Sequence, residues 1–287
     1  MNTVSMRRNS GRIALSVAAV LAVWSAGCGS QDETKGTTVA STANGGQVIN
    51  GAGATFPVPL YQKWFAEYGQ KNGVQINYQP VGSGGGIKDI TAKTVDFGAS
   101  DAPMSDAELA KAPGVLHVPT VAGAVTIAYN VPGVPSGLKL TGDVIADIFL
   151  GKIALWNDPR LAALNPGVTL PALKIVPIHR ADGSGTTNIF TNYLSAVSPA
   201  WQSGPGMGKS VNWPGGAAAK GNPGVAALVQ QTQGAVGYVE LAYAVQNKIA
   251  FAQVRNAAGK FITPSVESTT AAASGVTLPP DFRKIIV

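Results

Sequence analysis

Short apolar segments with the alternation of β-strands are interleaved with segments whose apolar residues recur at helical spacing. Val74–Tyr78 alternates like a strand, and the helix predicted before it carries Leu60 and Trp64 on one face. Further along, Leu173–Ile178 is predicted as a strand and Ile189–Val197 as a helix. A chain that alternates strands with helices in this way is restricted to the α/β fold class.

Several local patterns give more detailed expectations. The run Gly82–Gly86 is predicted as a loop, with a helix opening from it over Ile87–Thr94. Ser105-Asp106-Ala107-Glu108 matches a helix capping box. A helix is expected to start near Thr55, and Val115–Val131 supplies β-branched, strand-like sequence.

Composition narrows the class of protein. The 287 residues are 45% hydrophobic and 13% charged, which suits a large core and excludes a disordered tail protein. The formal net charge of +6 includes Arg7, Arg8 and Arg12. Without this basic start the positive excess is mild and dispersed, so no nucleic-acid partner is expected, although a small anionic ligand is compatible with it.

The N-terminus has the pattern of an export signal. The basic start precedes an apolar run over Ile13–Val23 that is too short to span a bilayer. Ser25-Ala26-Gly27-Cys28 follows and resembles a bacterial lipoprotein cleavage box, with Ser25 where leucine is usual. We expect residues 1–27 to be a signal peptide, lipidated Cys28 to anchor the chain at the cell envelope, and residues 28–47 to form a flexible tether. The alternative is a plain signal peptide with an incidental cysteine.

Three junctions place glycines and hydroxyl side chains before a predicted helix. They are Gly53-Ala54-Thr55-Phe56, Gly82–Gly86 and Asp182-Gly183-Ser184-Gly185-Thr186-Thr187. Free N–H groups and the positive end of the helix dipole attract anions there, and glycine lets an oxyanion approach. Arg180 can offer a bidentate fork to a tetrahedral oxyanion, with Asp182 holding the fork through a salt bridge. The alternatives are ordinary caps and turns for the loops and a surface ion pair for the two charges.

These segments, with Val95–Asp101, closely resemble the periplasmic phosphate-binding proteins of bacterial phosphate ABC importers. The resemblance continues through Gly151-Lys152-Ile153, Trp156, Trp213-Pro214 and Gly237-Tyr238-Val239-Glu240. It implies an α/β fold of the two-lobed, type II periplasmic-binding-protein kind, with residues 48–120 in lobe one and 121–265 in lobe two. Residues 266–287 are expected to be an irregular tail in which the family's continuation is missing, which would leave lobe one incomplete.

The resemblance also implies nine phosphate ligands, and this chain carries the family residue at each position: Thr55, Phe56 and Gly185 (the last two through their backbones), Ser83, Asp101, Arg180, Asp182, Ser184 and Thr186. Asp101 is the unusual member, because a carboxylate repels an oxyanion unless the ligand carries a proton that it can accept. We therefore expect Asp101 to favour phosphate over sulfate. Capping of the following helix is its alternative role.

The function implied by the resemblance is high-affinity binding of inorganic phosphate outside the cytoplasm and delivery to an ABC permease by lobe closure. No cofactor is expected, and a monomer is the family expectation. The alternatives are a truncated paralogue that buffers or senses phosphate without transport, and a phosphoester hydrolase.

An enzyme is not favoured by the residues. Ser184 lies in Asp-Gly-Ser-Gly rather than in a Gly-x-Ser-x-Gly elbow, and the histidines are His117 and His179. Gly208-Lys209-Ser210 resembles the end of a phosphate-binding P-loop, but the first glycine of that motif would fall at Ser203. No Cys or His cluster has metal-ligand spacing, so no metal is expected.

Overall fold

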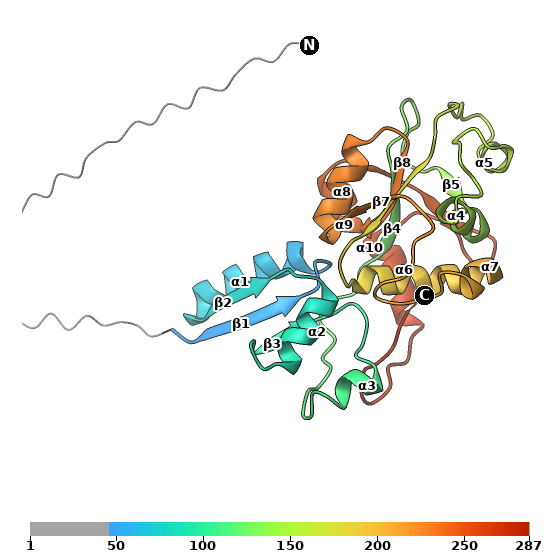
Figure 1. Cartoon of the computed structure of the whole chain (residues 1–287). Helices are drawn as coiled ribbons and strands as arrows, with labels where there is room; N and C mark the ends of the chain where they lie inside the picture. The colour runs from blue at the N-terminus through green and yellow to red at the C-terminus, as the bar shows by residue number, and fades with distance from the viewer. Residues whose placement is uncertain (1–45, 287) are drawn as a thin grey trace, which may run out of the picture. The chain divides into compact units, whose positions relative to one another are not determined.

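The computed structural model describes residues 46–286. The predicted signal peptide 1–27, Cys28 and the tether up to residue 45 lie outside the described residues. No helix within the described range is long and apolar enough to cross a membrane. The described chain carries two main sheets with helices packed on them (Figure 1).

The first sheet, in the segment predicted as lobe one, has three parallel strands in the order β2-β1-β3. Its elements are β1 (Val48–Gly53), α1 (Val58–Asn72), β2 (Gln75–Gln79), α2 (Ser83–Thr91), β3 (Phe97–Ala99) and α3 (Asp106–Leu109). Tyr61 of α1 is buried, and its ring meets Tyr78 of β2 edge-on with centroids 5.4 Å apart. Aromatic packing thus holds α1 against this sheet.

The second sheet, in the segment predicted as lobe two, has five strands in the order β7-β6-β8-β4-β9. Its strands are β4 (Val125–Tyr129), β6 (Val176–Arg180), β7 (Ala217–Ala219), β8 (Ala235–Glu240) and β9 (Ala250–Phe251). β4 is antiparallel to β8, whereas β6 is parallel to β7 and β8. A small sheet of order β11-β10-β5 joins β5 (Lys139–Leu140), β10 (Gln253–Arg255) and β11 (Phe261–Ile262).

Helices cover both faces of the five-stranded sheet (Figure 1). α6 (Gly185–Val197), α8 (Gly221–Gln231) and α9 (Leu241–Gln246) pack directly on its strands, α4 (Gly142–Phe149) and α7 (Pro199–Ser203) pack on α6, and α5 (Pro159–Leu164) packs on β5. Phe149 and Leu194 belong to one buried cluster with Tyr238, and Val225 and Val229 belong to another. All six residues of β8 are buried between these two clusters, so this strand is central to lobe two. The α/β fold class expected from the alternation is confirmed.

The prediction of a loop over Gly82–Gly86 was wrong, because α2 already begins at Ser83. A Cβ placed on Gly86 would lie 2.5 Å from Gly53 Cα and 2.6 Å from Ala52 O. The glycines therefore let the first turn of α2 press backbone against backbone on β1, which allows a helix where glycine normally disfavours one.

Other boundaries differ less. The capping box is confirmed, since Ser105 Oγ accepts from Glu108 N while Glu108 Oε2 accepts from Ser105 N. α1 starts at Val58, after Pro57, and the strand expected within Val115–Val131 is limited to β4. β-branched residues before β4 therefore lie in a connection between the two sheets rather than in a strand.

The expected irregular tail over residues 266–287 is partly wrong. α10 (Val266–Ser274) forms there, and Ser265 caps it by a reciprocal exchange of hydrogen bonds with Ser268. The chain then returns to lobe one, where Arg283 Nη1 lies 2.5 Å from Asp106 Oδ1. Local capping and one ion pair thus order a segment whose composition gave little sign of structure. The incompleteness of lobe one and the lobe boundary near residue 120 stay predictions.

Candidate anion-binding site

The site lies where the starts of α2, α6 and α8 approach the loop that follows β1. Gly185 N, at the start of α6, donates to Ser83 Oγ at 3.0 Å, and Asp101 N donates to the same oxygen at 3.4 Å. Ser83 and Asp101 come from the segment predicted as lobe one and Gly185 from the segment predicted as lobe two. Residues separated by about a hundred positions in the sequence therefore share one buried polar region.

Arg180, at the end of β6, forms a forked ion pair with Asp182. Its Nε donates to Asp182 Oδ1 at 2.8 Å and its Nη2 to Oδ2 at 2.5 Å. The two side chains are 2% and 13% exposed, so the alternative of a surface ion pair is wrong. Burial acts to raise the pKa of Asp182, but the hydrogen bonds from Arg180 and from Gly221 N outweigh it and hold this pKa below its usual value. Because Nε and Nη2 bind Asp182, the guanidinium is fixed and its Nη1 takes no part in this ion pair.

Asp101 holds an acceptor in this region. Its Oδ2 accepts from Thr186 Oγ1 at 2.8 Å, whereas its Oδ1 is buried and has no hydrogen-bond partner among the described residues. Burial raises the pKa of Asp101 to about 6, against the opposing effects of the Thr186 hydrogen bond and the Arg180 charge. A buried acceptor without a partner is costly, so a group that can donate to Oδ1 would be favoured here.

Thr55, Ser83 and Thr186 bring buried hydroxyls to the same place, each no more than 4% exposed. Thr55 is fixed from several sides, because Asn222 donates to its Oγ1 and the hydroxyl of Tyr243 donates to its carbonyl. The arrangement thus combines hydroxyl, N–H and guanidinium donors with one free carboxylate oxygen.

Two of the nine predicted residues have additional structural contacts. Ser184 is fully buried, and its Oγ caps α6 by accepting from Thr187 N at 3.0 Å. A hydroxyl that accepts in this way keeps its own proton for another acceptor. Phe56 packs with Ala54 and Tyr61. Of the other seven, Thr55, Ser83, Asp101, Gly185 and Thr186 are linked by hydrogen bonds to one another or to Asn222, while Arg180 and Asp182 bond to each other and Asp182 also accepts from Gly221 N.

Sequence reasoning did not find Asn222 and Glu240. Asn222 is fully buried at the start of α8, directly after Gly221, whose φ of +68° lies in the left-handed region. This is a fourth glycine-led helix start, and that signal was present in the sequence. Burial raises the pKa of Glu240 to about 7, and the charge of Asp101 adds to the rise. Its Oε2 accepts from Ala242 N and caps α9.

The histidines lie in structural positions. His179 stacks on Trp213 with ring centroids 4.8 Å apart, and His117 Nε2 accepts from Met104 N at 3.1 Å. Burial lowers the pKa of both rings. Neither His117 nor His179 is hydrogen-bonded to Ser184. Within residues 46–286 no group of three or more His, Cys, Asp or Glu residues could hold a metal ion.

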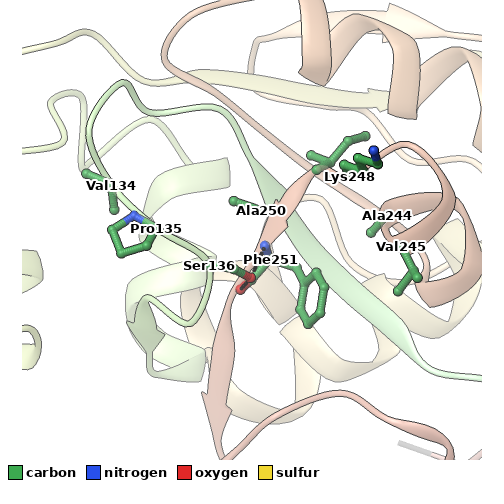
Figure 2. A pocket seen from close by; sticks show the side chains of 9 residues that line it. Val134, Pro135, Ser136, Ala244, Val245, Lys248, Ala250 and Phe251 are labelled. Atoms are coloured by element: carbon green, nitrogen blue, oxygen red, sulfur yellow. Dashed lines mark hydrogen bonds between the residues drawn. The ribbon is translucent and has the colours of Figure 1, made fainter.

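A shallow surface pocket lies elsewhere, beside β9 (Figure 2). Val134, Ser136, Ala244 and Phe251 are among the residues that line it. Ser136 Oγ exchanges hydrogen bonds with the backbone of Phe251, donating to its oxygen and accepting from its nitrogen, each at 3.1 Å. This pocket therefore offers few free polar groups, in contrast to the region around Arg180 and Asp101.

Two β-sheets, each with helices packed on it, share one buried polar site, which is the arrangement of a two-lobed binding protein. The domain model of the PBP superfamily matches residues 33–284. The phosphate-binding protein PstS of Xylella fastidiosa strain Temecula1 is 50% identical over 246 residues, which are 85% of this chain and 67% of that protein. PstS of Pasteurella multocida strain Pm70 is 53% identical over 229 residues, 79% of this chain and 66% of that protein. The chain therefore belongs to the PstS family of phosphate-binding proteins, and it spans about two thirds of the length of these relatives.

Solved structures share the fold. A DING protein is 26% identical with a TM-score of 0.63, covering 81% of this chain and 70% of that one. A substrate-binding protein from Clostridium perfringens, solved with bound phosphate, is 20% identical with a TM-score of 0.63, covering 79% and 82%. The type II periplasmic-binding-protein fold is thus confirmed.

Proposed function

We propose that this chain binds inorganic phosphate in the buried site between its lobes and delivers it to an ABC permease. The observation that carries the proposal is the buried Oδ1 of Asp101, an acceptor without a partner placed among donors. The relatives at 50% and 53% identity are named phosphate-binding proteins, which supports the same ligand.

The chemistry of the site favours a tetrahedral oxyanion that still carries a proton. Arg180 and the helix N-termini suit the unprotonated oxygens, while Asp101 Oδ1 suits the oxygen that bears the proton. Sulfate has no proton at neutral pH, so it would meet a lone pair of Asp101 and leave that acceptor unsatisfied. Selection of phosphate over sulfate follows from this one contact.

The nine residues predicted as ligands divide into three roles. Arg180 and the backbone N–H of Phe56 would donate to the anion, and Gly185 N, which donates to Ser83 Oγ in this structure, would exchange that acceptor for a ligand oxygen. The hydroxyls of Thr55, Ser83 and Ser184 would also donate to the anion, whereas the Thr186 hydroxyl, which donates to Asp101 Oδ2, would lie beside the anion and orient that carboxylate. Asp101 would accept the ligand proton, and Asp182 would orient the guanidinium.

Closure of the two lobes around the ligand is the step that a permease would recognise. Contacts that join lobe one to lobe two support it. Ser83 meets Gly185 within the site, and Lys209 Nζ lies 2.9 Å from both carboxylate oxygens of Glu108 at its edge. Bound phosphate would add contacts to both sides and stabilise the closed form.

The site of action that fits this role is outside the cytoplasm. Residues 1–27 would direct export, and Cys28 would carry a lipid that holds the chain at the membrane surface while residues 28–47 act as the tether. A monomer is sufficient, because both halves of the site come from one chain. Mass spectrometry of the exported protein would test the lipid on Cys28.

Equilibrium dialysis of the purified chain against labelled inorganic phosphate tests the ligand directly. The expected result is saturable binding of one phosphate per chain, with no release of phosphate from a phosphoester. Turnover of a phosphoester would favour the hydrolase alternative. Binding without restored phosphate uptake in cells that lack their own binding protein would favour the buffering or sensing alternative.

A further inference from the structure

Asn222 occupies a position that joins both lobes. It is fully buried, and its backbone N and its side-chain Nδ2 each donate to Thr55 Oγ1 at 3.0 Å. Nδ2 also lies 3.2 Å from Thr186 Oγ1. One amide group thus contacts a hydroxyl of lobe one and a hydroxyl of lobe two.

The orientation of this amide is fixed by its neighbour. Glu240 N donates to Asn222 Oδ1 at 2.9 Å. A backbone N–H can only donate, so the atom that receives it must be the amide oxygen. The other end of the amide is therefore the NH₂ group, and it faces Thr55 and Thr186 as a donor.

This orientation determines what the Thr55 hydroxyl can do. A hydroxyl has two acceptor lone pairs and one proton. The two donors of Asn222 occupy both lone pairs of Thr55 Oγ1. The Thr55 hydroxyl can then only donate its proton, which suits an unprotonated oxygen of the ligand.

The same amide acts on Asp101 through Thr186. Thr186 Oγ1 accepts from Asn222 Nδ2 and donates to Asp101 Oδ2 at 2.8 Å. Asp101 Oδ2 is thereby occupied, and Oδ1 remains as the acceptor. The orientation of the Asn222 amide therefore sets the direction of the hydrogen bonds that run from Asn222 through Thr186 to Asp101.

We propose that Asn222 is a positioning and specificity-determining residue for the anion site. It keeps Thr55 as a donor and Asp101 Oδ1 as the acceptor, and so sets the pattern of donors and acceptor that a protonated oxyanion matches. This inference rests on the proposed binding of phosphate, and it concerns a residue that need not touch the anion itself.

A double-mutant cycle tests the coupling, with binding of inorganic phosphate and sulfate measured by calorimetry on the full chain. Asn222→Ala should weaken phosphate binding by about 10- to 100-fold, because the two side-chain hydrogen bonds that orient Thr55 and Thr186 are lost. It should also narrow the phosphate-to-sulfate ratio, because Thr186 is free to turn away from Asp101. In a Thr55→Val background, which has no hydroxyl to orient, the same change should cost much less affinity.

Asn165→Ala is the matched control. Asn165 is also a buried asparagine, and its amide is bonded to Lys139 and Leu161 within lobe two. Its loss should lower the thermal midpoint without changing the phosphate-to-sulfate ratio. If Asn222→Ala and Asn165→Ala act alike, or if the Asn222 and Thr55 effects simply add, the inference is wrong.

An isosteric variant covers the case in which Asn222→Ala does not fold. Asn222→Asp keeps the shape and the backbone donor but removes the NH₂ group. Its deficit in phosphate affinity relative to the parent should be large at pH 8 and smaller at pH 5, where a protonated carboxyl can donate again. Because the phosphate affinity of the variant is compared with that of the parent at the same pH, the titration of Asp101 and Glu240 contributes to both.

A deficit that does not change with pH would contradict the inference. If the parent itself bound no phosphate, the proposed function would fail and this inference with it. If the parent bound phosphate and Asn222→Asp bound it equally well at pH 8, only the role of Asn222 would fail.

Discussion

Arg180 is the residue on which the proposed phosphate site depends most. Its guanidinium is almost fully buried and is held by both oxygens of Asp182. A buried ion pair of this kind adds little to stability by itself, because desolvation offsets the attraction. In the proposed site, the pair would serve to present a fixed positive group to the anion.

Arg180→Ala should therefore reduce phosphate affinity by at least about 100-fold, since it removes a charge-assisted donor and leaves Asp182 as an uncompensated negative charge. Calorimetric titration measures the change. Arg160→Ala is the control, because Arg160 is 46% exposed and pairs with Asp147 and Asp158 on the surface. Phosphate affinity that survived in the Arg180 variant would show that the site lies elsewhere.

Asp101→Asn tests whether this single residue gives the site its selectivity for phosphate over sulfate. The amide oxygen can still accept from Thr186, while the new NH₂ group would donate toward the ligand where Oδ1 now accepts. We expect the phosphate-to-sulfate affinity ratio to fall by at least about tenfold, more than the phosphate affinity itself. Competition binding with both anions measures the ratio. A ratio equal to that of the parent would leave Asp101 a purely structural role, and the exposed Asp106→Asn variant should leave the ratio unchanged.

At the scale of elements, the packing of α2 on β1 positions Ser83. The contact depends on Gly86, which has backbone atoms of Gly53 and Ala52 where a side chain would begin. The helix start is thus set by a close approach between backbones rather than by helix propensity.

Gly86→Ala should destabilise the chain by about 1–3 kcal/mol, because backbone atoms cannot move aside as a flexible side chain can. This corresponds to a thermal midpoint lower by about 2–4 °C for each kcal/mol. Gly215→Ala is the control, since a Cβ there would meet nothing within 4 Å. Equal midpoints for the two variants would refute the tight packing of α2 on β1.

Local patterns predicted those elements that depend on neighbouring residues. The capping box at Ser105, the strand near β6 and the loop around Asp182 follow from short-range chemistry. The helical state of Gly82–Gly86 could not be predicted, because it depends on contact with β1. Asn222 escaped notice for a related reason: its partners Thr55, Thr186 and Glu240 meet it only after both sheets have formed.

For the whole molecule, burial of carboxyl groups links stability to pH. Glu240 has its pKa raised to about 7, chiefly by burial, whereas in the unfolded chain it is close to the ordinary value of about 4.3. Between about pH 4 and 7 the folded state therefore holds a proton that the unfolded state has released. The contribution of Glu240 to the free energy of unfolding falls as the pH rises through this window.

Glu240→Gln isolates this contribution from those of the other titrating groups. The variant keeps an oxygen to accept from Ala242 N, so it should gain stability relative to the parent as the pH increases from 5 to 8. Thermal unfolding of the ligand-free chain at both values measures the gain. Glu67→Gln, on the exposed face of α1, should show no such shift. If Glu240→Gln instead became less stable relative to the parent as the pH rose, the raised pKa of Glu240 would be contradicted.

The proposed site is shared by the two lobes and is selective for protonated phosphate. Calorimetric titration of the purified chain at neutral pH, with phosphate in one experiment and sulfate in another, tests it most directly. We expect a single tight phosphate site and sulfate binding weaker by at least about a thousandfold, because Asp101 would be left without a donor. Comparable affinity for the two anions, or no heat from a folded chain with phosphate, would contradict it.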